Sequence, residues 1–261
     1  MHLSSHQLRH YTYIVSCILI VSISVLYVVG GPFWHPSVVN QTRPQTAAIV
    51  DELSGTIPNP VFTQDATTQL IRAGFKVDYY GPDQVTVGLL KQLPSMGYGI
   101  VIFRNHSTGW SGDVIAILTS EPYSADKYPY EQLNGQLIRA RLGVAARDYF
   151  AVTPKFVREV MQGSFPSTIV VMMGCTGLVN SEMAQAFVAK GAKAYVSWEQ
   201  VVLAWRTDEA TVALLQSLIS GKPLGVAVAT ATDNVPPDPL YNSQLGYYPL
   251  DQSALLLSNG F

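Results

Sequence analysis

Two short segments of this chain carry apolar side chains at almost every position, and they constrain the fold more than any other feature. They read GIVIFR at 99–104 and TIVVMM at 168–173. A strand with one face in water alternates apolar and polar side chains, whereas a strand covered on both faces is apolar throughout. The two segments therefore predict central strands of a parallel sheet with helices on each side.

Helix-like stretches separate these strands from shorter ones of the same kind. Further strands are predicted at 47–50, 76–80 and 194–198, and helices at 64–73, 85–93, 182–190, 208–220 and 223–232. Strands that alternate with helices form parallel sheets through right-handed crossovers. The predicted fold class is α/β, a three-layer αβα sandwich with a mostly parallel sheet.

Two regions outside this alternation are less regular. The stretch 115–165 contains one strand-like segment at 148–153 and a helix from 154 to about 162. The Pro- and Tyr-rich stretch 233–261 is expected to wrap the edge of the domain rather than to form a second one.

The N-terminal region predicts a membrane anchor. Residues 11–30 contain no charged side chain, and roughly 20 such residues are enough for a helix to cross a bilayer. Arg9 precedes the run and the next basic residue is Arg43, which favours a cytoplasmic N-terminus and an extracytoplasmic domain. The alternative is a cleaved signal peptide, although the run ends in VVGGP without a clear small-residue cleavage site. The expected organisation is a tail at 1–10, the anchor at 11–30, a linker at 31–45 and one α/β domain at 46–261.

Charge and cysteine content exclude several classes of function. The net charge is -2, so no basic surface for nucleic acid is expected. The chain has 2 cysteines, Cys17 in the apolar run and Cys175 in the domain, and they form no pair spaced for zinc. Of the 5 histidines, only His106 lies in the domain. We expect neither a metal nor another cofactor.

The two central strands each run directly into a reactive side chain. His106 follows the segment 99–104, and Cys175 follows the segment 168–173. The carboxyl ends of parallel strands meet at one edge of a sheet, which is where ligands bind in such folds. A thiol needs a nearby base because the thiolate is the nucleophile. Gly174 and Gly177 allow close backbone approach beside the thiol.

The order of the two residues narrows the class of cysteine enzyme. No histidine follows Cys175, whereas papain-like enzymes, class I glutaminases and α/β-hydrolases place the histidine after the nucleophile. The nucleophile elbow G-x-C-x-G is also absent, because Met173 occupies its first glycine position.

The segments VIFRNHSTG and IVVMMGCTG, together with the continuation FVAKGAKAYVSWEQ, resemble the caspase-like cysteine peptidases, closest to the CHAT and gingipain-like domains. The resemblance implies that Cys175 is the nucleophile and His106 the general base and acid. It also implies that the backbone N–H groups of Cys175 and Ser107 bind the oxyanion. Many members have glycine after the histidine, so Ser107 leaves open which amide completes the oxyanion hole. The implied reaction is hydrolysis of a polypeptide substrate through a thioester, without a cofactor.

The resemblance also implies a substrate pocket beside the strand at 194–198. Trp198 and Glu199 would line it, and Glu199 would favour a basic residue before the scissile bond, although a surface glutamate is the simpler interpretation. Asp208 is a further candidate for substrate binding, against the alternative of a charge at a helix N-terminus. Arg104 and Asp113 are expected to be solvated surface charges, with polar groups at the rim of the cleft as the alternative.

Three functions remain open from the sequence. The first is a membrane-anchored cysteine endopeptidase. The second is a catalytically silent caspase-like module that binds peptides, because a fold alone does not imply activity. The third is an amidase that uses the same dyad on a substrate other than a peptide. An isolated cysteine after an apolar strand is usually only a small core residue, so the hydrolase hypothesis depends on the pair.

Overall fold

The computed structural model describes residues 45–107, 114–141 and 147–257. The predicted tail and anchor, and all of the predicted linker before Gln45, lie outside these residues, as does Asp113. Among the helices that are described, none has the length and apolarity that crossing a bilayer would require.

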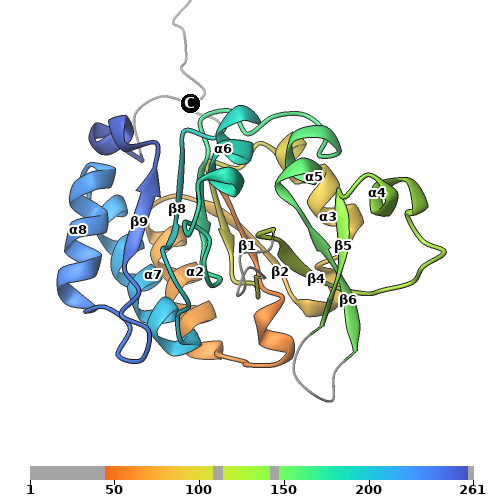
Figure 1. The fold of residues 1–261 in the computed structure, drawn as a ribbon. Helices are drawn as coiled ribbons and strands as arrows, with labels where there is room; N and C mark the ends of the chain where they lie inside the picture. Colours follow the sequence, from red (N-terminus) through yellow and green to blue (C-terminus); the bar gives the residue numbers. More distant parts are fainter. Residues whose placement is uncertain (1–44, 108–113, 142–146, 258–261) are drawn as a thin grey trace, which may run out of the picture. The chain divides into compact units, whose positions relative to one another are not determined.

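A six-stranded sheet forms the centre of the described residues, with strand order β2-β1-β3-β7-β8-β9 (Figure 1). Its members are β1 (Thr46–Val50), β2 (Lys76–Tyr80), β3 (Ile100–Phe103), β7 (Ile169–Met172), β8 (Ala194–Trp198) and β9 (Leu245–Tyr248). The first five strands in this order are parallel to one another, and β9 pairs antiparallel with β8. The fold is therefore mixed α/β with a mostly parallel sheet, as predicted.

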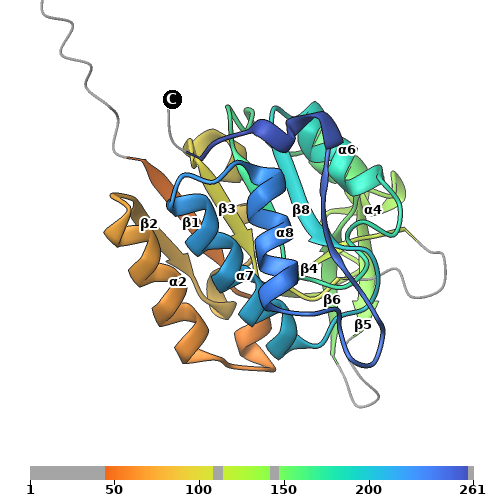
Figure 2. The same ribbon diagram turned by 90° about the vertical axis from the view of Figure 1, so that its left-hand side faces the viewer.

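Helices cover both faces of this sheet (Figures 1 and 2). One face packs against α2 (Pro60–Arg72), α7 (Ala204–Ile219) and α8 (Leu224–Asn234). The other packs against α3 (Val87–Gln92), α5 (Pro154–Glu159) and α6 (Glu182–Ala189). The three predicted layers are confirmed.

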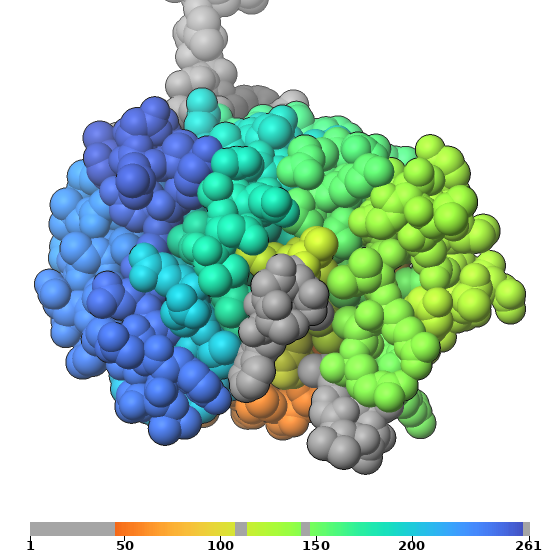
Figure 3. Space-filling view, in the orientation of Figure 1, coloured from red at the N-terminus to blue at the C-terminus, as the bar shows by residue number. Residues whose placement is uncertain are grey.

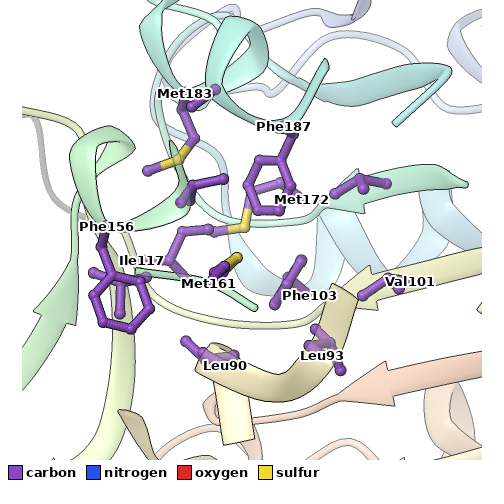
Figure 4. Packing of buried hydrophobic residues seen from close by; sticks show 14 of the residues in the cluster. Leu90, Leu93, Val101, Phe103, Ile117, Phe156, Met161, Met172, Met183 and Phe187 are labelled. Atoms are coloured by element: carbon purple, nitrogen blue, oxygen red, sulfur yellow. The ribbon is translucent and has the colours of Figure 1, made fainter. Parts of the chain in front are cut away.

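The apolar character of β3 and β7 follows from these two layers. Val101 and Phe103 of β3 join the cluster under α3, α5 and α6, and Figure 4 shows them beside Leu93 and Met172. Ile100 and Ile102 point to the opposite cluster under α2, α7 and α8. Every residue of both strands is buried, so neither face tolerates a polar side chain.

A second, smaller sheet occupies the region that was predicted to be irregular. It contains β4 (Ile117–Pro122), β6 (Asp148–Val152) and β5 (Leu137–Arg141), antiparallel and in the order β4-β6-β5, with α4 (Pro129–Leu133) beside it. In the space-filling view this sheet (green) and the C-terminal elements (blue) lie on opposite sides of one face (Figure 3). An isolated bridge between Ser107 and Ile117 joins the small sheet to the segment that follows β3.

Most predicted elements lie where expected, and two helices begin earlier. The start of α2 is Pro60 rather than residue 64, because Asn59 accepts the Phe62 N–H at 3.2 Å as an N-cap and Pro60 occupies the first turn. The start of α7 is Ala204 rather than residue 208. The C-terminal stretch was expected to wrap the domain edge, and it supplies the edge strand β9. Four short 3-10 helices complete the described elements: η1 (Leu53–Gly55), η2 (Pro82–Gln84), η3 (Leu93–Met96) and η4 (Leu250–Ala254).

Candidate active site

The loops that follow β3 and β7 lie side by side at the carboxyl edge of the sheet. The strands are parallel neighbours in register, with Phe103 opposite Met172. Each leads within three residues to its reactive side chain, His106 on one loop and Cys175 on the other. The adjacency that the sequence hypothesis required is therefore present.

The two loops also touch. The Ser107 hydroxyl donates a short hydrogen bond to the Cys175 carbonyl oxygen. A Cβ added to Gly174 would lie 2.6 Å from the Asn105 carbonyl oxygen and 2.8 Å from Ser107 Oγ. Position 174 therefore requires glycine, because any side chain would push the two loops apart.

Cys175 is half-buried against the segment that joins β8 to α7. Its Sγ lies 3.6 Å from the Val202 carbonyl oxygen, and its side chain packs against Trp198 and Val202. Burial is the main cause that raises the pKa of the thiol. The thiol in this arrangement is therefore protonated at neutral pH, and it needs a base to react.

The turn after Cys175 holds an uncommon backbone conformation. Thr176 has φ +57°, in the left-handed region that residues other than glycine seldom adopt. Its N–H donates to the Gln200 carbonyl oxygen at 2.8 Å, so the turn is fixed to the same β8–α7 segment. Strained turns of this kind are concentrated at functional sites.

His106 is held by the turn that follows β1. Its Nε2 lies 3.1 Å from Thr56 Oγ1, and its backbone N–H donates to Glu52 Oε2 at 2.8 Å. The Thr56 hydroxyl also lies 3.2 Å from the Leu53 carbonyl oxygen, to which it donates. We therefore assign the proton of the neutral ring to Nε2, which leaves Nδ1 as the acceptor. Burial and the charge of Arg104 lower the pKa of His106, so the ring is neutral at pH 7.

The imidazole and the thiol are each held by a group other than their expected partner. Within the described residues, the ring bonds with Thr56 and the thiol with Val202. The structure thus brings the two loops into contact and leaves the two side chains in separate hydrogen bonds.

The two backbone amides expected to bind an oxyanion lie in these loops. Leu118 N–H donates to the His106 carbonyl oxygen at 2.9 Å, which fixes the peptide plane before Ser107. Within the part of the chain that is described, the N–H groups of Ser107 and Cys175 donate to no acceptor on another residue.

The three side chains predicted to bind substrate have different surroundings. Trp198 ends β8, is 2% exposed and donates from Nε1 to Thr207 Oγ1 at 2.9 Å. Glu199 follows it and is exposed. Asp208 is buried, and its carboxylate accepts hydrogen bonds from Arg104 and Asn59 on both oxygens.

Arg104 is the centre of a buried ionic network, and the expectation of a solvated charge was wrong. Its side chain is fully buried and pairs with Asp51 at 3.0 Å and Asp208 at 2.8 Å. It also donates to the Ile57 carbonyl oxygen at 3.1 Å and lies over the Phe62 ring. The network joins the ends of β1 and β3 to α7. Because Arg104 lies two residues before His106, it fixes the start of the loop that carries His106.

Sequence reasoning missed the turn after β1 altogether. Asp51, Glu52 and Thr56 lie at the carboxyl end of a predicted parallel strand, the same position that singled out His106 and Cys175. Applying the strand-end rule to this strand would have found them. Among the described residues, no group of three or more His, Cys, Asp or Glu side chains is placed to hold a metal ion.

Comparison with solved structures gives 13 matching chains. The chain is similar to the crystal structure of the Drosophila initiator caspase Dronc, with a TM-score of 0.41 and 11% sequence identity over 80% of this chain and 79% of that chain. No protein-family model matches the sequence, and no curated protein does. The likeness assigns no activity and no residue role to this chain.

Proposed function

We propose that this chain is a caspase-like cysteine hydrolase, most simply an endopeptidase, in which His106 and Cys175 act together. The observation that supports it best is the in-register pairing of β3 with β7, which delivers both loops to one edge of the sheet. The contact between Ser107 and the Cys175 carbonyl adds to it, because it keeps the loops together when the side chains move.

The reaction follows from the chemistry of the two groups. Neutral His106 takes the thiol proton, and the Cys175 sulfur attacks the carbonyl carbon of the substrate. The N–H groups of Ser107 and Cys175 donate to the oxyanion of the tetrahedral intermediate. The protonated imidazole then gives its proton to the leaving amine, and a thioester forms. Water, deprotonated by the same imidazole, hydrolyses the thioester and restores the thiol.

On this proposal, the hydrogen bonds of Cys175 and His106 describe a resting state. Val202 holds the thiol and Thr56 holds the ring, so rotation of the Cys175 side chain must precede proton transfer. A substrate strand that binds along the β8–α7 segment would displace the thiol from the Val202 carbonyl. Catalytic hydrogen bonds commonly form only in the substrate complex.

A peptidyl acyloxymethyl ketone probe tests the proposal. The wild-type chain is expected to form a thioether at Cys175, whereas Cys175→Ala and His106→Asn should not, with unchanged melting temperatures as the control for folding. A folded wild-type chain that no such probe labels would contradict it and favour the silent peptide-binding module. That second function is supported by the resting hydrogen bonds of both side chains. Cleavage of simple amides but of no peptide library would instead identify an amidase.

We further propose that Glu199 gives preference for a lysine or arginine before the scissile bond, with Trp198 as the wall of that pocket. Glu199 is exposed at the carboxyl end of β8, on the edge that carries Cys175. Glu199→Gln should lower kcat/KM for basic substrates by at least tenfold and leave neutral ones unchanged. An unchanged preference would remove Glu199 from the pocket.

We also propose that residues 11–30 anchor the chain in a membrane and that the hydrolase domain is extracytoplasmic. The support is the uncharged run and the preceding Arg9. The full chain should resist alkaline carbonate extraction, and the domain should be digested by protease added to intact cells. A soluble mature chain that begins after residue 30 would instead indicate a cleaved signal peptide.

A further inference from the structure

A buried carboxylate lies beside the proposed base, and no cation among the described residues forms an ion pair with it. Glu52 is 4% exposed and follows β1 in the turn that also carries Thr56. Its Oε2 accepts the backbone N–H of His106 at 2.8 Å. Glutamate is seldom buried unless it is paired with a cation or another strong donor. The burial of Glu52 therefore requires an explanation.

Arg104, whose charge acts on Glu52, is already engaged by other groups. Arg104 donates to Asp51, to both oxygens of Asp208 and to the Ile57 carbonyl oxygen. Glu52 therefore shares the charge of Arg104 with two other carboxylates. Burial raises the pKa of Glu52 to about 7, with Asp51 adding to the rise, and the His106 N–H and Arg104 opposing it. A neutral residue at position 52 would make the fold more stable at neutral pH. Residues that lower the stability of the fold in this way are typical of functional positions.

We propose that Glu52 is the positioning residue of the general base, fixing the backbone of His106 while Thr56 fixes the ring. One short turn then holds both ends of the histidine, and the Glu52 carboxylate itself does not touch the substrate. The catalytic consequence rests on the proposed function, whereas the coupling of Glu52 to His106 can be measured without any reaction.

The ionised carboxylate is the stronger acceptor, because hydrogen bonds to charged groups are shorter and roughly twice as strong as neutral ones. The His106 loop should therefore be held more tightly as Glu52 loses its proton. The charged or titratable groups that face Glu52 are Asp51 in its own turn, Arg104 after β3, and His106 itself. We therefore expect His106, the proposed base, to become better ordered as pH rises through about 7 and Glu52 ionises.

The direct test follows the backbone amide at position 106 by NMR while the pH is changed. In His106→Asn the ring is gone and the amide remains, so its chemical shift reports Glu52 without a contribution from the imidazole. We expect an inflection near pH 7, and we expect the double variant His106→Asn with Glu52→Gln to lose it. An amide whose titration is the same with and without Glu52 would overturn the proposal.

The functional test measures alkylation of Cys175 by iodoacetamide in the full chain carrying Cys17→Ser. Glu52→Ala should react roughly 10- to 100-fold more slowly at pH 7.5, since small displacements of a catalytic group have effects of this size. Glu52→Gln retains an acceptor, so it should keep most of the rate and lose the inflection near pH 7. A folded Glu52→Ala with the wild-type rate and pH profile would refute the positioning role. If His106→Asn also left the alkylation rate unchanged, the proposed function of the His106–Cys175 pair would be wrong. The amide titration would still test whether Glu52 is coupled to the backbone of His106.

Discussion

Replacing Arg104 with methionine is expected to destabilise this fold far more than the same change at an exposed arginine. Methionine keeps most of the apolar stem of the side chain and removes its charge, which leaves Asp51 and Asp208 buried without their cation. Removing one partner of a buried ion pair costs roughly 3–5 kcal/mol. For a domain of this size each kcal/mol lowers Tm by about 2–4 °C. Arg104→Met should therefore lower Tm by ~6–20 °C.

The assay is thermal unfolding followed by circular dichroism at pH 7.5, with two comparison variants. Arg141→Met removes an arginine whose ion pair with Asp148 is mostly solvated, and its Tm should change much less. Adding Asp51→Asn and Asp208→Asn to Arg104→Met should recover part of the loss, because the unpaired charges disappear. A fall in Tm for Arg104→Met no larger than that for Arg141→Met would refute the view that the network supports the His106 loop.

Two further outcomes follow from the same edge of the sheet. Gly174→Ala places a methyl group 2.6 Å from the Asn105 carbonyl oxygen and should cost about 1–3 kcal/mol by urea unfolding. Gly88→Ala is the control without a close contact, because its methyl group would lie 3.6 Å from Thr86 Oγ1, and an equal cost for the two variants would contradict a loop–loop contact. Glu52→Gln should leave stability nearly unchanged below pH 4.5 and raise it progressively as pH rises to about 7, by up to roughly 3 kcal/mol at 1.4 kcal/mol per pKa unit. The variant gains stability because the folded chain binds the Glu52 proton more tightly than the unfolded chain does. If Glu52→Gln were no more stable than the wild type at pH 8, the buried ionised carboxylate would not destabilise the fold.

The sequence was sufficient for the central strands, because burial on both faces leaves an apolar signal in every residue. It failed for β5 and β9, which read LIRAR and LGYY and are partly exposed, so their polar and small residues hid the pattern. The sequence predicted β6 but not its antiparallel partners β4 and β5, because pairing between strands is a tertiary property.

The site was predictable only where the reactive groups follow central strands. His106 and Cys175 were found in this way, and their adjacency required only the order of β3 and β7. The burial of Arg104 was not predictable, since its carboxylate partners lie 53 and 104 residues away along the chain. The same applies to Glu52, which contacts His106 across 54 residues.

The measurement that tests the central claim most directly is the pH dependence of the alkylation rate of Cys175 in the wild-type chain and in His106→Asn. If the imidazole activates the thiol, the wild type should react at pH 7 on the order of a hundredfold faster, with a rising limb near the lowered pKa of His106. The variant should react only as the buried thiol itself ionises, at higher pH. Superimposable profiles for the two chains would mean that His106 and Cys175 do not act together, and the hydrolase proposal would be wrong.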